Sequence, residues 1–240
     1  MQNPWTNIFD GDIGRLDRYS LKEERPVIDE FNKSISDEFK IYDTVFPSAY
    51  SNIKTSDILL LLTNPGYDQK EKDNGVYDDT ERISQYLRNL IEDTVPTSEK
   101  LLSPYWEKKL NKLTKIYPLE IVKSHISIVQ FFPYHSIKFR EIPKKLIKKY
   151  FPNSNYLPSQ EYTFHLLREA LIRKPVIIIT RSKKQWLEAL PELNTYEYCF
   201  ETNNYRNPIL SENNFSKFPN AWKVINDKIS VSVKSNEVQN

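Results

Sequence analysis

Four polar motifs of this chain combine residue types that can support hydrolytic chemistry. They are Asn64-Pro65-Gly66-Tyr67-Asp68, Pro133-Tyr134-His135-Ser136, the single residue Arg181, and Asn207-Pro208-Ile209-Leu210-Ser211. A carboxamide such as that of Asn64 can orient a water molecule through its oxygen, although it is no general base at neutral pH. The carboxylate of Asp68 is a stronger base, and the guanidinium of Arg181 suits a phosphate group. These motifs are therefore the candidate site.

Each motif also has a structural interpretation that the sequence leaves open. Asn64-Pro65-Gly66 is typical of a tight turn, and Asp68 is typical of an Asx turn that stabilises the backbone. His135 could contact a phosphate or the charge that builds on a leaving group, or it could be a hydrogen-bonded structural histidine. Ser136 and His135 make a poor nucleophilic pair, because adjacent side chains of an extended segment point to opposite sides.

Four apolar segments predict the strands that would position these motifs. They are residues 58–62, 126–132, 176–180 and 196–200. Residues 58–62 are a continuous apolar run, which is typical of a strand buried on both faces of a parallel sheet, whereas residues 196–200 alternate less clearly. Three of the polar motifs follow the first three strands directly, and the fourth lies several residues past the last strand. The motifs would therefore meet at the carboxyl edge of the sheet, where ligands bind in such folds.

Apolar residues at helical spacing predict helices between and around the strands. The first follows Pro26 and contains Val27, Ile28, Phe31, Ile35 and Phe39. The others cover residues 80–93 with Thr80 as cap, 104–116 with Ile116 on the inner face, 159–171 with Ser159 as cap, 183–190, and 216–229.

Alternating strands and helices imply an α/β fold. We expect a three-layer α/β/α sandwich with a mainly parallel four-stranded central sheet. Residues 1–55 would form an N-terminal helical extension, residues 56–230 the α/β domain, and residues 231–240 a flexible tail.

The composition is that of a globular protein, with 39% hydrophobic and 28% charged residues. The single cysteine, Cys199, cannot form an intrachain disulfide, and three histidines without Cys/His spacing favour neither a metal site nor a cofactor. The first residues lack the charged and apolar regions of a signal peptide, and the apolar run 58–62 is too short to cross a bilayer. We therefore expect a cytoplasmic protein that uses no metal, no cofactor and no membrane.

Local charge is more informative than the net charge of +2. Residues 138–149 contain six basic residues and one acid, and such clusters suit phosphate backbones. Lys144, Lys145 and Lys148 are therefore candidate contacts to a DNA backbone. The alternative is an ordinary solvated helix face.

Two of the motifs resemble those of the uracil-DNA glycosylase superfamily, most closely the mismatch-specific uracil/thymine-DNA glycosylases. In that family a Gly-x-Asn-Pro-Gly turn follows the first strand, as Asn64-Pro65-Gly66 does here. A second motif near the C-terminal end begins Asn-Pro or His-Pro and continues with a small residue, Leu and Ser or Asn, which residues 207–211 resemble. The resemblance covers roughly residues 57–227. It implies a DNA glycosylase-like enzyme without metal or cofactor, which hydrolyses the N-glycosidic bond of an extruded uracil-like, mispaired or modified base in single- or double-stranded DNA.

The resemblance also implies roles for individual residues. Asn64 would position the attacking water, and Asn207 would donate a hydrogen bond to the base carbonyl as negative charge develops on it. Tyr67 could stack on the base with Gly66 beneath it, and Leu210 would be the apolar wedge that fills the vacated stack. The other substrate contacts expected from the four motifs are Pro65, Tyr134, Ser136, Arg181, Pro208 and Ser211.

The chain departs from the family pattern at two places. Leu62 stands where the first motif has glycine, and it would narrow the pocket if that glycine lets a base approach the backbone. The second motif is one residue shorter and has Ile209 in place of serine. Two alternatives therefore stay open. One is a catalytically inactive module of this fold that binds nucleic acid or a nucleotide, and the other is a hydrolase of small nucleotides that uses Asp68 and His135.

Overall fold

The computed structural model describes residues 1–8, 16–75, 77–96 and 104–237. The chain forms two compact units, each made of three separate segments. The first unit contains Met1–Ala49, Thr63–Val95 and Gln130–His165, and the second contains Tyr50–Leu62, Pro96–Val129 and Leu166–Asn240. The expected domain boundary at residue 55 falls inside the first segment of the second unit.

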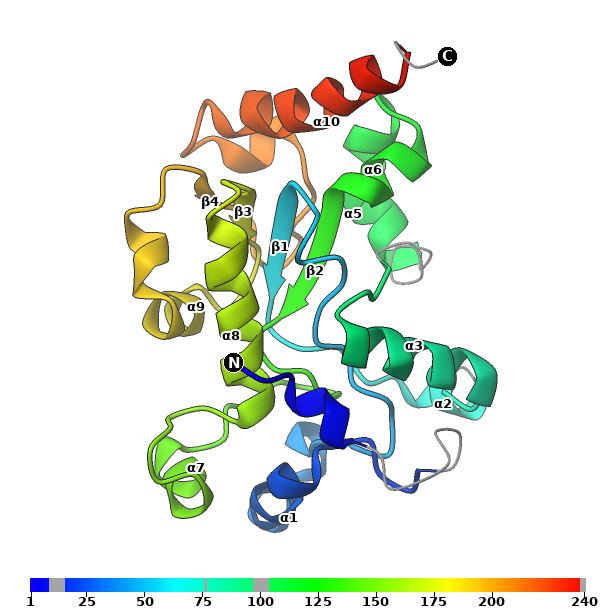
Figure 1. The fold of residues 1–240 in the computed structure, drawn as a ribbon, viewed down its shortest axis with the longest axis vertical. Coiled ribbons are helices and arrows are strands. Elements are labelled where there is room, and N and C mark those ends of the chain that lie inside the picture. The colour runs from blue at the N-terminus through cyan, green and yellow to red at the C-terminus, as the bar shows by residue number, and fades with distance from the viewer. Residues whose placement is uncertain (9–15, 76, 97–103, 238–240) are drawn as a thin grey trace. The chain divides into compact units, whose positions relative to one another are not determined.

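A four-stranded, all-parallel sheet forms the centre of the second unit (Figure 1). Its strands are β1 (Ile58–Leu62), β2 (Ile126–Gln130), β3 (Val176–Ile179) and β4 (Cys199–Glu201), in the order β2-β1-β3-β4. Every residue of β1, β2 and β3 is buried, which explains the continuous apolar runs of β1 and β3, and β2 also buries Ser127 and Gln130. The expected α/β class, consistent with a three-layer α/β/α sandwich, is confirmed.

The ends of two strands differ from the prediction. β2 stops at Gln130 instead of residue 132, and the backbone N–H of Phe132 donates instead to the carbonyl of Thr63 at 2.8 Å. β4 begins at Cys199 instead of residue 196, because a turn precedes it in which the N–H of Cys199 donates to the carbonyl of Tyr196 at 3.1 Å.

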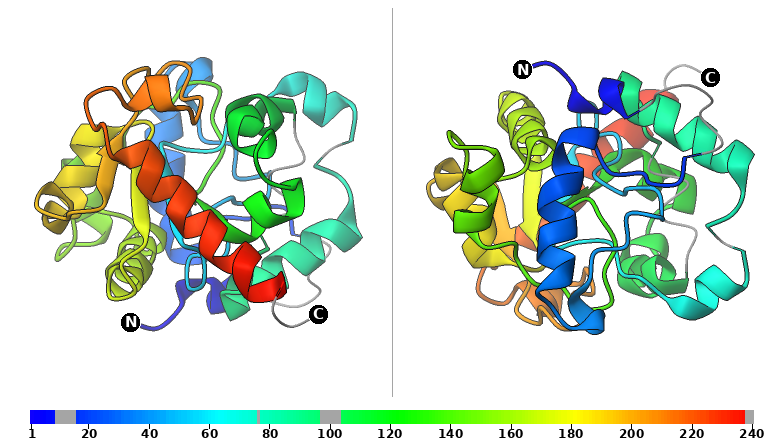
Figure 2. Two further views of the ribbon diagram at one scale, coloured as in Figure 1. Left: turned by 90° about the horizontal axis from the view of Figure 1, so that it is seen from above. Right: turned by 90° about the horizontal axis from the view of Figure 1, so that it is seen from below.

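Helices of the second unit cover both faces of the sheet. α5 (Pro104–Thr114), α6 (Leu119–His125) and α10 (Ala221–Glu237) share a core with Ile58, Leu60 and Leu62 of β1. Figure 2 shows α10 in red running alongside α6 in green, and these two helices are in contact. α9 (Lys183–Ala189) lies on the other side of the sheet in Figure 1, and Trp186 on it donates its indole N–H to the Leu62 carbonyl at 2.8 Å.

Three features of these helices correct the sequence prediction. α6 was not predicted, because it has only seven residues and the next residue, Ile126, is already extended. α5 ends at Thr114, so Ile116 lies outside it and is 55% exposed. α10 begins at Ala221 and continues to Glu237, well past the predicted end at residue 229 and into the expected tail. Residues 238–240 of that tail lie outside the described residues.

The first unit contains α1 (Arg25–Lys33), α2 (Gln69–Asp73), α3 (Thr80–Glu92) and α7 (Lys144–Tyr150). α8 (Pro158–Leu171) begins in this unit and continues into the second at residue 166. Short 3-10 helices cover Pro4–Asn7, Lys22–Glu24 and Asp37–Phe39 in the first unit, and Pro191–Asn194 and Glu212–Phe215 in the second. None of the helices in the described ranges combines the length and apolar character needed to cross a membrane.

Local hydrogen bonds explain where the predicted helix ends of the first unit were wrong. α1 ends at Lys33, where the next residue, Ser34, donates both its N–H and its hydroxyl to the Phe31 carbonyl, so Ile35 and Phe39 are not part of it. Asp79, not Thr80, caps α3, because its carboxylate accepts the N–H of Arg82 at 3.0 Å. Ser159 is not a cap either, since it lies within α8.

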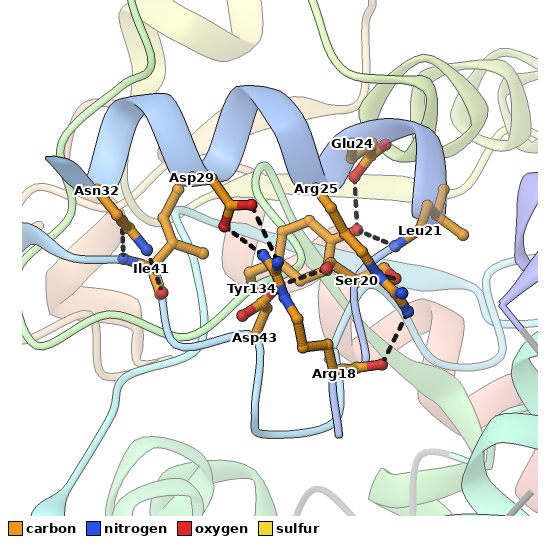
Figure 3. A network of polar contacts seen from close by, with 10 residues as sticks. All are labelled: Arg18, Ser20, Leu21, Glu24, Arg25, Asp29, Asn32, Ile41, Asp43 and Tyr134. Carbon is orange, nitrogen blue, oxygen red and sulfur yellow. Dashed lines mark hydrogen bonds and ion pairs between the residues drawn. The ribbon is translucent and has the colours of Figure 1, made fainter. Parts of the chain in front are cut away.

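A polar network connects α1 to neighbouring segments of the first unit (Figure 3). Arg18 forms ion pairs with Asp29 at 2.8 Å and with Asp43 at 2.7 Å. The side chain of Asn32 on α1 exchanges two hydrogen bonds of 2.9 Å with the backbone of Ile41. The segment 36–43 is therefore fixed against α1 by directional polar contacts.

Candidate functional site

The predicted turn at Asn64 and the predicted segment ending at Ser136 come together in the first unit. The side-chain nitrogen of Asn64, Nδ2, donates to the Ser136 hydroxyl and to the carbonyl of Pro65, each at 2.8 Å. A carbonyl oxygen can only accept, so the Pro65 contact defines which end of the carboxamide is the nitrogen. Within the described residues, the other end, Oδ1, accepts no hydrogen bond. The Asn64 side chain is thus fixed through its donor and presents an unused acceptor.

Backbone pairing holds these two segments in register. Gly66 and Ser136 form a parallel bridge, in which the N–H of Tyr67 donates to the Ser136 carbonyl at 3.1 Å and the N–H of Ser136 donates to the Pro65 carbonyl at 3.4 Å. His135 is buried, and its Nδ1 lies 2.7 Å from the Gly66 carbonyl. Because that carbonyl is an acceptor, Nδ1 carries a proton. The side chains of His135 and Ser136 contact different partners, as expected for neighbours on an extended segment.

Gly66 lies next to unoccupied space. A Cβ atom added to it would meet nothing within 4 Å, and the residue is exposed. The folded chain itself therefore does not require glycine here. The unoccupied space next to Gly66 would let a ligand approach the backbone beside Asn64.

Tyr67 belongs to a group of aromatic rings beside this turn. It stacks on Tyr42 with the ring centroids 3.9 Å apart and the planes 3° apart, and Tyr77 lies nearly parallel to it at 6.1 Å. Burial raises the pKa of the Tyr67 hydroxyl, and so does the neighbouring Tyr42. One face of Tyr67 is therefore already covered, and a base could stack on it only after Tyr42 moves or by using another part of the ring. Sequence reasoning missed Tyr42, which lies in no motif.

Asp68 has the structural role that the sequence left open. Its carboxylate caps α2 by accepting the backbone N–H of Lys70 at 2.8 Å, and the residue is exposed. No hydrogen bond joins Asp68 to Asn64 or His135 in the described part of the chain. A general-base role for Asp68 would therefore require it to leave the helix cap.

Tyr134 is fully buried and anchors the segment that leads to His135. Its hydroxyl donates to the carboxyl of Glu24 and accepts the N–H of Leu21 at 3.2 Å (Figure 3). Glu24 also accepts the N–H and the hydroxyl of Ser159, at 2.7 and 3.0 Å. Burial raises the pKa of Glu24 to about 7, against the opposing effect of these hydrogen bonds. This network positions the residue next to His135, and sequence reasoning missed Glu24 because a lone acid in a charged helix start carries no signal of burial.

The three predicted lysine contacts lie on α7 in the same unit. Lys145 and Lys148 are exposed and form no ion pair with any described residue, while the Lys144 ammonium lies 5.9 Å from the centre of the Tyr156 ring. Lys149, the next residue, is paired with Glu30. Two of the three predicted positions are thus free to meet a polyanion.

A second polar cluster lies in the second unit, around Asn207. The ammonium of Lys109 donates to the Asn207 side-chain oxygen, and the Leu210 N–H donates to the Lys109 carbonyl at 3.0 Å. A lysine can only donate, so this contact identifies Oδ1 and leaves Nδ2 of Asn207 as the available donor. Within the described residues Nδ2 makes no hydrogen bond. The carboxamide of Asn207 is therefore fixed through its acceptor and presents its donor.

Lys109 itself was missed by sequence reasoning. It is 5% exposed, and its ammonium lies 4.9 Å from the centre of the Tyr105 ring. The signal was available, because residue 109 follows Trp106 by three positions and precedes Leu113 by four, which puts it on the apolar face of the helix. A charged residue at such a position indicates a site, since burying an ammonium is unfavourable.

The other predicted residues of the second unit have differing environments. Leu210 is 1% exposed and belongs to the hydrophobic core, and Pro208 is also buried, so neither projects as a wedge. Ser211 is partly buried, and Arg181 is exposed directly after the strand β3 and Thr180. Leu62, at the position of the family's glycine, is 6% exposed and packs in the same core, so its side chain fills the protein interior.

No protein-family model, curated protein or solved structure matches this chain. Its chemistry is therefore interpreted from its own residues. The first unit offers a fixed acceptor at Asn64 beside an open glycine, and the second offers a fixed donor at Asn207 beside the ammonium of Lys109.

Proposed function

We propose that this chain is a DNA glycosylase-like N-glycosyl hydrolase, which removes an extruded uracil-like, mispaired or modified base. One observation carries the proposal. Asn64 is held through its nitrogen, which donates to the Ser136 hydroxyl and the Pro65 carbonyl, and it presents its oxygen beside the open space at Gly66. Base excision needs such an acceptor to orient the attacking water.

In the proposed reaction the bond between C1′ and the base nitrogen breaks, and its electron pair leaves with the base. A water molecule adds to C1′ of the oxocarbenium-like sugar and loses a proton, which neutralises the departed base. The Asn64 oxygen would orient this water by accepting one of its hydrogens. Because a carboxamide accepts no proton at neutral pH, the enzyme would be slow and would favour labile or mispaired bases.

The open space at Gly66 supports close approach of a nucleotide to the Asn64 turn. The exposed Lys145 and Lys148 support a nucleic-acid partner, because their charges are not neutralised by neighbouring acids among the described residues. A cytoplasmic location is part of the proposal, and the single free thiol of Cys199 is in keeping with it.

The first alternative, a catalytically inactive module that binds nucleic acid or a nucleotide, is favoured by one observation. Tyr42 covers the face of Tyr67 with a separation of 3.9 Å, so the predicted stacking surface is occupied. The second alternative, a hydrolase that uses Asp68 and His135, has less support, because Asp68 caps a helix and Nδ1 of His135 is bound to Gly66.

The test is a single-turnover excision assay on labelled oligonucleotides that carry uracil, mispaired thymine, hypoxanthine or hydroxymethylated pyrimidines. The variants are Asn64→Ala and, as a matched control, Asn155→Ala, which changes an exposed asparagine of the same unit. Abasic sites formed by the wild type and by Asn155→Ala, but not by Asn64→Ala, would support the proposal. Binding of the oligonucleotides without excision of any base would favour the inactive module, and excision by Asn64→Ala at the wild-type rate would remove Asn64 from the mechanism.

A further inference from the structure

The second unit buries a positive charge that no acid among the described residues compensates. Lys109 is 5% exposed, and within the described part of the chain its ammonium contacts the Asn207 side chain and the face of the Tyr105 ring. None of the carboxylates in the described residues pairs with it. An amide oxygen and an aromatic ring compensate an ammonium only in part. A buried charge of this kind is unfavourable for folding and is better explained by a ligand than by stability.

A second cation, Arg181, lies at the same edge of the sheet as the segment that holds Lys109. Arg181 follows β3 directly, and Asn207, which accepts from the Lys109 ammonium, lies in the segment that follows the neighbouring strand β4. Burial and, to a smaller extent, the charge of Arg181 lower the pKa of Lys109. Arg181 is exposed and forms no hydrogen bond or ion pair with the described residues. The neighbouring Lys183, in contrast, is neutralised by Glu201 at 2.9 Å. Two uncompensated cations, one buried and one exposed, therefore belong to the same part of the second unit.

The end of the adjacent strand adds a neutral donor. In the parallel register of β3 and β4, Ile179 pairs with Glu201, so Thr202 follows β4 at the level where Thr180 follows β3. Thr202 is 6% exposed, and its hydroxyl oxygen has no hydrogen-bond partner among the described residues. Carboxyl ends of neighbouring parallel strands form the edge at which ligands bind in this class of fold. Arg181 and Thr202 both lie at that edge.

We propose that Lys109 and Arg181 form a binding site for a phosphate group, with Thr202 beside it. A guanidinium matches two phosphate oxygens with two parallel N–H groups, and an ammonium fixed by Asn207 supplies a second, immobile charge. Two positive charges suit a phosphate, which carries one negative charge in a diester and close to two in a monoester. A neutral ligand would leave both charges uncompensated. The site needs no bond cleavage, so it goes beyond the proposed reaction and can be tested without it.

The chemistry fits a phosphate of a free nucleotide as well as one in a nucleic-acid backbone. Three probes separate these sources and can be compared by isothermal titration calorimetry on the full chain. They are a deoxynucleoside 5′-monophosphate, the same nucleoside without phosphate, and a short unmodified single-stranded oligonucleotide. Tighter binding of the monophosphate would identify a free nucleotide, and tighter binding of the oligonucleotide would identify the backbone.

The variants are Arg181→Gln and Lys109→Met, with Lys112→Met as control. Arg181 is exposed, so its replacement leaves the fold unaffected, and Lys112 is an exposed lysine of the same helix. The wild type and Lys112→Met should bind the better phosphate probe at least about tenfold more tightly than the nucleoside, and Arg181→Gln and Lys109→Met should each lose most of this difference. The proposal is overturned if the nucleoside binds as tightly as both phosphate probes, or if Arg181→Gln binds them like the wild type.

Discussion

The carboxamides of Asn64 and Asn207 are chemically identical, yet their surroundings make them opposite reagents. Asn64 is held by neutral partners, a hydroxyl and a backbone carbonyl, and the oxygen of its amide is left over. Asn207 is held by the ammonium of Lys109, and the nitrogen of its amide is left over. The residue type therefore does not determine the role. Which end of an asparagine can act is set by whether its neighbour donates or accepts.

The two surroundings differ in energetic terms as well. The groups that hold Asn64 in the first unit are neutral, and the buried carboxyl of Glu24 in the same unit accepts three hydrogen bonds. Around Asn207 the second unit holds a buried ammonium without a counter-ion among the described residues. The first arrangement should therefore stabilise the fold, and the second should cost stability and serve binding.

The largest expected effect is on excision, and it tests the role of the free acceptor of Asn64. Asn64→Ala should lower the single-turnover rate by about 10²–10³-fold, because it removes a positioned polar group used in the transition state. Wild-type activity of Asn64→Ala would show that the free acceptor of Asn64 is not used.

The next effect is the pH dependence of the first unit, which follows from Glu24. Its pKa is about 7 in the folded protein and 4.5 when unperturbed, so the folded state prefers the protonated form. Protonation of Glu24 in the folded state therefore contributes fully to the free energy of unfolding below about pH 4.5. This contribution of roughly 3 kcal/mol is lost as the pH rises through about 7. Chemical denaturation between pH 4.5 and 8 should detect it. Glu24→Gln should flatten this profile, whereas Glu81→Gln, which changes an exposed acid of the same unit, should leave it unchanged.

A smaller effect distinguishes substrate binding at the Asn64 turn from the stability of the fold around it. Gly66→Ala adds a methyl group into open space, so the melting temperature should not change. If a nucleotide approaches this backbone, the same methyl group should lower excision by about tenfold or more, since small misplacements of substrate are costly in rate. Wild-type activity in Gly66→Ala would mean that the substrate stays clear of this peptide.

The smallest expected effect is a gain in the free energy of unfolding rather than a loss. Lys109→Met replaces a buried charge by an apolar chain of similar length, and it should raise the free energy of unfolding by about 1 kcal/mol while it removes phosphate binding. Lys112→Met should change neither property. Thermal denaturation without ligand distinguishes the outcomes, and a destabilised Lys109→Met would contradict the view that the second unit gives up stability at this position.

The elements that could be predicted from the sequence are those that appear in it as mainly apolar segments. The three buried strands and the parallel α/β class could be predicted, because each strand is a mainly apolar segment of four or five residues, which is too short for a helix and lies between predicted helices. The pairing of Asn64 with Ser136 was suggested only indirectly, by two motifs that follow neighbouring strands. It could not be derived, because a side-chain contact between residues 72 positions apart depends on how two loops are registered.

Other features of the structure were not predicted, because their sequence signals are short or ambiguous. α6 has only seven residues, and no helix-breaking residue separates it from β2. The cap of α3 lies one residue earlier than predicted, because Asp79 and Thr80 are both good capping residues. Tyr42 and Glu24 could not be recognised at all, because their importance comes from the partners Tyr67 and Tyr134, which are distant in the sequence.

The segmented construction of the two units has a consequence for synthesis and for fragments of the chain. The polypeptide changes unit after residues 49, 62, 95, 129 and 165. No single cut can release either unit as a continuous piece, and a ribosome must reach residue 165 before the first unit has all its segments. Strand β1 must also wait for β3, whose first residue follows more than a hundred positions later, before their ladder can form. Nascent chains should therefore depend on protection from aggregation for most of their elongation, and a nicked protein should keep both halves together.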